Sequence, residues 1–113
     1  MASKPRYLLK INPLVESEDI PALPIELQAD FVEIYQPVLQ VAPYKCEGLP
    51  SHGLKGDLSG YRALEVECVG NPNAYRLVYR IYEKPAPRRV LIISFAAHDP
   101  AYEKAKARAG GKK

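Results

Sequence analysis

The sequence contains no apolar run that approaches the ~20 residues a helix needs to span a membrane. Its first residues, MASKPRYLLKINP, also lack the apolar stretch of about 7–15 residues that marks a secretory signal peptide. We therefore expect a protein that does not bind membranes and that resides in the cytoplasm.

Cysteine and histidine are scarce as well. Cys46 and Cys68 stand apart, without the CxxC spacing of a redox or zinc motif. His52 and His98 do not lie near them in a pattern of metal ligands. The sequence predicts neither a disulfide nor a metal site, and we expect no cofactor.

What is present suits a single globular domain. The chain has 113 residues, of which 47% are hydrophobic and 26% charged, as in an ordinary soluble domain. That length allows a core without a metal or disulfide staple. We expect one domain over residues 1–113, with a frayed tail at 110–113.

Charge is distributed unevenly along the chain. Residues 1–53 carry four basic and seven acidic side chains, a net charge of −3. Residues 54–113 carry twelve basic and six acidic side chains, a net charge of +6. A basic half is typical of proteins with a polyanionic partner.

The order of predicted elements indicates an α+β fold. Residues 7–11 read as a strand, and apolar residues spaced three and four apart from Leu27 to Leu39 predict a helix that starts near Pro24. Pro37 is expected to kink that helix or end it early. The stretch 43–60 reads as loop, and 61–69, 74–82 and 89–96 read as strands in a meander. A short C-terminal helix should follow, capped by Asp99. We expect a small twisted antiparallel sheet, with the N-terminal strand beside the meander and N-terminal helices on one face.

The strand AYRLVYRIY, residues 74–82, places arginine on every fourth position. Alternation puts Tyr75, Leu77, Tyr79 and Ile81 on one face, and Arg76, Val78, Arg80 and Tyr82 on the other. The two guanidinium groups are then roughly 13 Å apart. Two interpretations remain open for this pair: a solvated surface or a platform for phosphates. Arg80 is also placed to pair with Glu65 or Glu67 across the sheet.

Three stretches resemble the RelE/ParE toxins of bacterial toxin–antitoxin pairs. HGLKGDLSGYRALEV at 52–66 resembles the family's entry into its sheet, NAYRLVYRIYE at 73–83 its most typical strand, and HDPAYEKAKAR at 98–108 its C-terminal end. The resemblance implies a twisted sheet with N-terminal helices on one face and a working surface on the other. It implies a ribosome-dependent endoribonuclease that inhibits translation, with a cognate antitoxin, the ribosome and mRNA as partners.

In the RNA-cleaving relatives a ribose 2′-OH attacks the neighbouring phosphorus without a metal. The resemblance places Arg76 at the catalytic strand arginine, whose planar fork binds two phosphate oxygens. It gives His98 as an acid or base, Tyr102 as a group that stacks on a base or orients the 2′-OH, and Arg62 as a second phosphate clamp. Surface charge is the alternative for Arg62 and Arg76, and anchoring of the last helix is the alternative for Tyr102.

Four further basic residues are predicted to bind the RNA backbone: Lys55, Arg80, Arg88 and Arg89. The cations of the C-terminal segment are expected to form a solvated face or to contact ribosomal RNA: Lys104, Lys106, Arg108, Lys112 and Lys113.

The sequence departs from the strongest RNA-cleaving relatives at Ala96 and Ala97, where those carry basic residues. Two alternatives therefore stay open. One is a ParE-like toxin that acts on DNA gyrase without being an enzyme. The other is a RelE-like protein without toxicity.

Overall fold

The computed structural model describes residues 6–68 and 71–110. Its strands form one five-stranded sheet in the order β1-β5-β4-β3-β2. The connection expected between the strands at 61–69 and 74–82 lies partly outside the described residues, and the tail positions 111–113 lie wholly outside them. The strands are β1 (Leu8–Ile11), β2 (Ser51–Gly53), β3 (Tyr61–Cys68), β4 (Asn71–Tyr82) and β5 (Arg89–Ala97).

The predicted meander is confirmed, since β3, β4 and β5 pair antiparallel in sequence order. The expectation of a wholly antiparallel sheet is wrong, because β1 runs parallel to β5, with Leu8 opposite Arg89. Helices rather than a tight turn follow β1, so no local signal fixes its direction. Strand β2 lies within the stretch predicted to be loop, and it pairs antiparallel with β3.

The N-terminal helical layer has two parts. A π-helical segment, Val15–Asp19, leads into α1 (Ile20–Ala22). Then α2 (Ile25–Asp30), a second π-helical segment (Phe31–Tyr35) and α3 (Gln36–Val41) follow one another directly. The helix does not end at Pro37. The π-helical segment Phe31–Tyr35 comes just before α3, and Pro37 lies in the first turn of α3, where a missing N–H costs least. Two short 3₁₀ turns, Cys46–Gly48 and Gly56–Leu58, lie in the loops around β2.

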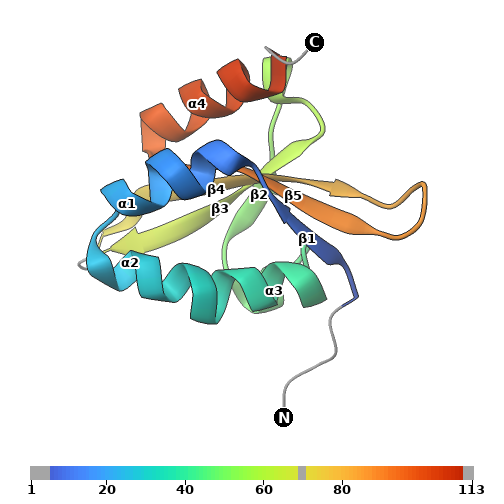
Figure 1. Cartoon of the computed structure of the whole chain (residues 1–113), viewed down its shortest axis with the longest axis horizontal. Helices are drawn as coiled ribbons and strands as arrows, with labels where there is room; N and C mark the ends of the chain where they lie inside the picture. The colour runs from blue at the N-terminus through green and yellow to red at the C-terminus, as the bar shows by residue number, and fades with distance from the viewer. Residues whose placement is uncertain (1–5, 69–70, 111–113) are drawn as a thin grey trace.

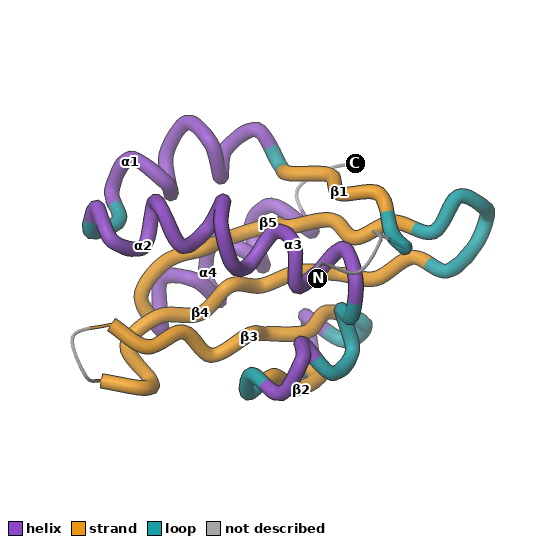
Figure 2. Tube along the Cα trace, turned by 90° about the horizontal axis from the view of Figure 1, so that it is seen from below, coloured by secondary structure: helices purple, strands orange, loops and turns teal. Residues whose placement is uncertain are grey.

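The helices cover both faces of the sheet. Helices α2 and α3 lie on one face, α4 (His98–Gly110) lies on the other, and α1 lies beside the β5 edge (Figures 1 and 2). We call the first face the α1–α3 side, because Val15 and Leu23, which flank α1, pack into its core. The core on the α1–α3 side is the larger. Its fully buried side chains include Leu27, Leu39, Leu64, Leu77, Tyr79, Ile92 and Phe95.

The predicted alternation along β4 is confirmed. Leu77 and Tyr79 lie in the α1–α3 core, whereas Val78 lies in the smaller core beneath α4. Buried Ala101 and Ala105, one helical turn apart, let α4 approach the strands closely. The face expected to be the open working surface is therefore partly covered by the C-terminal helix.

Candidate functional site

Arg76 is buried at the contact between β4 and α4. Its side chain is only 6% exposed, which excludes the solvated-surface interpretation for this residue. Arg76 Nε donates a hydrogen bond to the Tyr102 hydroxyl at 3.2 Å, and Nη1 donates to the Tyr75 carbonyl at 3.0 Å. The guanidinium is thus fixed beneath the first turns of α4.

His98 and Asp99 complete a cluster around Tyr102. The His98 ring meets the Tyr102 ring edge to face, with centroids 5.0 Å apart. His98 Nδ1 lies 2.7 Å from Asp99 Oδ1, and half of the His98 side chain is exposed. Helix α4 begins at His98, so Asp99 lies inside the first turn rather than directly before it. The structure therefore brings together three of the predicted catalytic residues: Arg76, His98 and Tyr102.

Glu65 and His52 join this site from the neighbouring strands, although the sequence placed His52 in a loop, with a catalytic role as the less favoured interpretation, and gave Glu65 only as a partner for Arg80. Glu65 on β3 is the cross-strand partner of Arg76. His52 Nδ1 on β2 lies 3.3 Å from Glu65 Oε2, and both side chains are partly exposed. The register of β3 against β4 was the missing information, because residues 67–73 could form a connection of several lengths.

Arg62 is not part of this cluster. It pairs with Tyr79, so its side chain projects from the α1–α3 face of the sheet. Its guanidinium donates to the Tyr44 carbonyl at 2.9 Å and to Ser51 Oγ at 3.0 Å. Those contacts hold the loop before β2 against β3, and they place Arg62 away from Arg76.

A buried polar pair joins the same loop to β4. Tyr79 donates to the Pro43 carbonyl at 2.6 Å, and its hydroxyl lies 3.3 Å from Cys46 Sγ. Burial raises the pKa of Tyr79, and the contact with Cys46 adds to that effect. The pair is structural, since both residues are buried.

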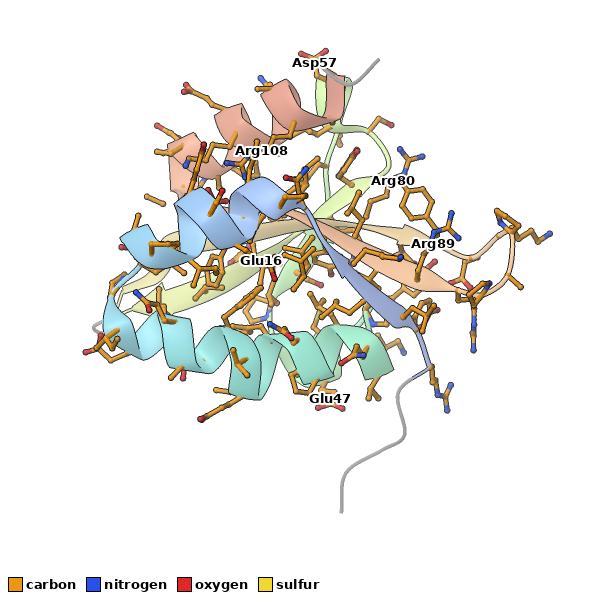
Figure 3. The ribbon with its side chains drawn as sticks, in the orientation of Figure 1. Glu16, Glu47, Asp57, Arg80, Arg89 and Arg108 are labelled. Atoms are coloured by element: carbon orange, nitrogen blue, oxygen red, sulfur yellow. The ribbon has the colours of Figure 1, made fainter. Side chains whose placement is uncertain are left out.

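Arg80 and Arg89 lie on the α4 side of the sheet, toward the β4–β5 hairpin (Figure 3). The expected pairing of Arg80 with Glu65 or Glu67 is wrong, because the register puts Tyr61 opposite Arg80. The Arg80 guanidinium instead stacks between two rings, those of Tyr61 and Tyr82.

Arg88 and Lys55 lie apart from that row. Arg88 stacks on the Tyr7 ring and lies 4.0 Å from the Glu83 carboxylate. Hydrogen bonds from Tyr7 and Tyr44 to Glu83 hold the pKa of this carboxyl below its usual range. Lys55 is exposed in the loop before β3.

Asp19 ties α4 to the N-terminal helices. It is 1% exposed and accepts hydrogen bonds from Arg108, Lys104 and the Phe95 N–H, all at 2.8–3.0 Å. Burial acts to raise the pKa of Asp19, but these hydrogen bonds outweigh it and leave the pKa below its ordinary value. Arg108, expected on a solvated or RNA-binding face, is therefore a buried structural residue.

Within residues 6–68 and 71–110, no three or more histidine, cysteine, aspartate or glutamate side chains gather as a metal would require. None of the helices in those ranges combines the length and the apolarity needed to cross a bilayer.

Comparisons with known proteins identify the fold. No family model matches the chain, and no curated protein matches it in sequence. A chain of the RelBE2 toxin–antitoxin complex from Mycobacterium tuberculosis is similar in structure, with a TM-score of 0.64, 22% identity, and coverage of 84% of this chain and 100% of that one. A chain of the archaeal RelE–RelB complex from Pyrococcus horikoshii has a TM-score of 0.62 and 20% identity, with coverage of 85% of this chain and 99% of that one. A YoeB/ParE toxin from Agrobacterium tumefaciens has a TM-score of 0.60 and 19% identity, with coverage of 80% of this chain and 98% of that one. The chain has the RelE/ParE-type toxin fold.

Proposed function

We propose that this protein is the toxin of a toxin–antitoxin pair, and that it cleaves mRNA on the ribosome and so blocks translation. The observation that carries the proposal is the convergence of Arg76, Tyr102 and His98 on one face of the sheet. The fold supports it, because the names of three structures that share the fold are those of toxins or toxin–antitoxin complexes.

Tyr102 is the group that stabilises the negative charge developing on the phosphate oxygens. Its hydroxyl accepts a hydrogen bond from Arg76 Nε, so its own proton remains available for a phosphate oxygen. The buried guanidinium behind it polarises that hydroxyl in a medium of low dielectric constant. Donors fixed in this way act where negative charge develops in the transition state.

Proton transfer is assigned to groups on both sides of Arg76. The attacking and leaving oxygens of a phosphoryl transfer lie roughly in line, so base and acid must stand on opposite sides of the phosphorus. His98 follows β5, and the His52–Glu65 pair lies on β2 and β3, so the two flank β4. A carboxylate only accepts, hence His98 donates Nδ1–H to Asp99 and leaves Nε2 for the RNA.

The step then balances without a further reactant. One group takes the proton of the ribose 2′-OH while the 2′-oxygen forms a bond to phosphorus. The bond from phosphorus to the 5′-oxygen breaks, and the other group protonates that oxygen. The products are a 2′,3′-cyclic phosphate and a 5′-hydroxyl end.

The partner under this proposal is a small cognate antitoxin that neutralises the basic surface. A second candidate function is a ParE-like toxin that acts on DNA gyrase without cutting RNA. The observation in its favour is the pair Ala96 and Ala97 at the end of β5, which supplies no cation beside Arg76.

The proposal is tested by mapping 5′ ends of mRNA after brief induction in a bacterial host. Wild type is compared with Arg76→Ala, and Lys45→Gln is the control for loss of a cation on the other side of the sheet. New cuts within reading frames that disappear only in Arg76→Ala support cleavage. Growth arrest with intact mRNA and damaged DNA would instead favour the gyrase-directed function.

A further inference from the structure

Tyr61, Arg80, Tyr82 and Arg89 form a stacked row across β3, β4 and β5. The Arg80 guanidinium lies 5.3 Å from the Tyr61 ring centroid and 5.1 Å from that of Tyr82. The Arg89 guanidinium lies 4.6 Å from the centroid of the same Tyr82 ring. Figure 3 shows Arg80 and Arg89 close to one another on the α4 side of the sheet, beside the hairpin. We call these four residues the stacked row.

The guanidinium of Arg80 is held in place without its donors being used. In the described part of the chain, none of its five N–H groups meets a protein acceptor, and it forms no ion pair. Gly60, with φ of +95°, supports it from the loop side, because a Cβ there would lie 3.6 Å from the Arg80 guanidinium carbon. Aromatic faces fix the plane of a guanidinium but leave its edge available to an external acceptor.

Arg89 is similar. Its Nη1 donates to the carbonyls of Pro85 and Pro87 at 3.0 and 3.3 Å, and within the described ranges it too has no carboxylate partner. Arg88 and Arg108, by contrast, each lie against a carboxylate. The row therefore carries two positive charges that no acidic side chain within residues 6–68 and 71–110 neutralises.

We propose that the stacked row is a preformed site for two phosphates of single-stranded RNA, separate from the cluster around Tyr102. Arg80 and Arg76 share one face of β4 four residues apart, about 13 Å at the rise of a strand. The row therefore holds nucleotides other than the pair that is cut. The inference rests on the proposed function for the identity of the substrate. Guanidinium forks read phosphate geometry and not base sequence, so binding is independent of sequence.

The test measures binding rather than cleavage. Anisotropy of a labelled oligouridine with 2′-O-methyl groups, which cannot be cut, is followed from ~50 to ~200 mM salt. For single strands, log K falls with log salt at a slope of about −0.7 per phosphate contact. Arg80→Gln and Arg89→Gln should each make the slope shallower by about 0.7, and the double variant by about 1.4. Oligoadenosine should give the same changes.

Two further variants test whether binding depends on the stacked row or on any positive charge of the protein. Lys45→Gln removes an exposed cation of the loop before β2, on the α1–α3 side, and its slope should match wild type. Tyr82→Leu keeps every charge but removes the central ring, and it should weaken binding with a smaller change in slope. An unchanged slope in a folded double variant would overturn the inference, as would an equal loss in Lys45→Gln. If cells show no cleavage but these shifts appear, the proposed enzyme activity fails and the binding site stands.

Discussion

At the scale of single residues, the proposed cleavage depends on how Tyr102 and Arg76 share their hydrogen bond. Arg76 is too deeply buried to form the outer surface of a phosphate site, so under the proposed mechanism it acts on RNA through the tyrosine hydroxyl. The exposed partner on the same ring is His98. This arrangement assigns the contact with phosphate to Tyr102 and the fixed positive charge to Arg76.

Tyr102→Phe tests that assignment with the smallest change. Removal of the hydroxyl deletes the phosphate donor, and cleavage should fall at least ~100-fold, the usual cost of losing one such donor. It also leaves Arg76 Nε without this acceptor, so the free energy of unfolding should fall by about 2 kcal/mol. Cleavage is measured in single-turnover assays, and stability by urea titration.

Glu103→Gln is the matched control, because that side chain is exposed on the same helix. Its cleavage rate and stability should stay at wild-type values. A Tyr102→Phe protein that is less stable but cuts RNA at the full rate would show that the tyrosine only anchors α4.

At the scale of elements, α4 is held against the part of β5 that extends beyond its pairing with β1. Strand β1 pairs with β5 only as far as Ile92. Beyond that point, the Asp19 carboxylate accepts the Phe95 N–H, and Arg108 donates to the Ile93 carbonyl. Side chains thus replace the missing strand, and the same ion pair ties α4 to the helices on the other face.

Asp19→Asn should lower the free energy of unfolding by about 3 kcal/mol, because it leaves the buried Arg108 with only the exposed Glu18 carboxylate as an ionic partner. The pKa of Asp19 is lowered in the folded protein, so the unfolded chain takes up its proton first as pH falls. The contribution of Asp19 to wild-type stability should therefore decline below about pH 4, the ordinary range of an aspartate, and disappear as the pH falls through the lower pKa of the folded state. The Asp19→Asn curve should be flatter there.

Urea titrations at several pH values measure both effects, and Glu18→Gln is the control. Glu18 also contacts Arg108 but is largely exposed, so its loss should cost less than ~1 kcal/mol. Equal losses for the two variants would contradict a buried clamp at Asp19.

The sequence predicted those elements whose formation depends on nearby residues. The alternation on β4 and the short β4–β5 connection specified the meander, and both are present. The direction of β1 was not predictable, since its partner β5 lies about eighty residues away in the chain. Nor was the role of Asp19, because an acidic residue in a polar stretch has no pattern that marks it for burial.

At the scale of the whole molecule, the sequence predicted part of the site. Arg76, His98 and Tyr102 meet as expected, since the end of β5 and the start of α4 lie beside β4. Arg62 lies on the other face, because side chains alternate along β3 and its neighbours Tyr61 and Ala63 face α4. Cross-strand register, which decides such questions, depends on loop geometry that spacing alone does not specify.

The layers also separate charge. The acidic half of the chain contributes α1–α3, and the basic half contributes β3, β4, β5 and α4 (Figure 1). Under the proposed function, RNA bound on the α4 side of the sheet meets both the cleavage cluster and the stacked row.

The most direct test of the central claim uses purified ribosomes loaded with a defined mRNA. Folded wild-type protein is added in the presence of a metal chelator that leaves the ribosomes intact, and the new RNA ends are identified. The account predicts cuts only in ribosome-bound mRNA, with 2′,3′-cyclic phosphate and 5′-hydroxyl ends, and none with Arg76→Ala. Intact mRNA after addition of folded protein would contradict it, as would 5′-phosphate ends.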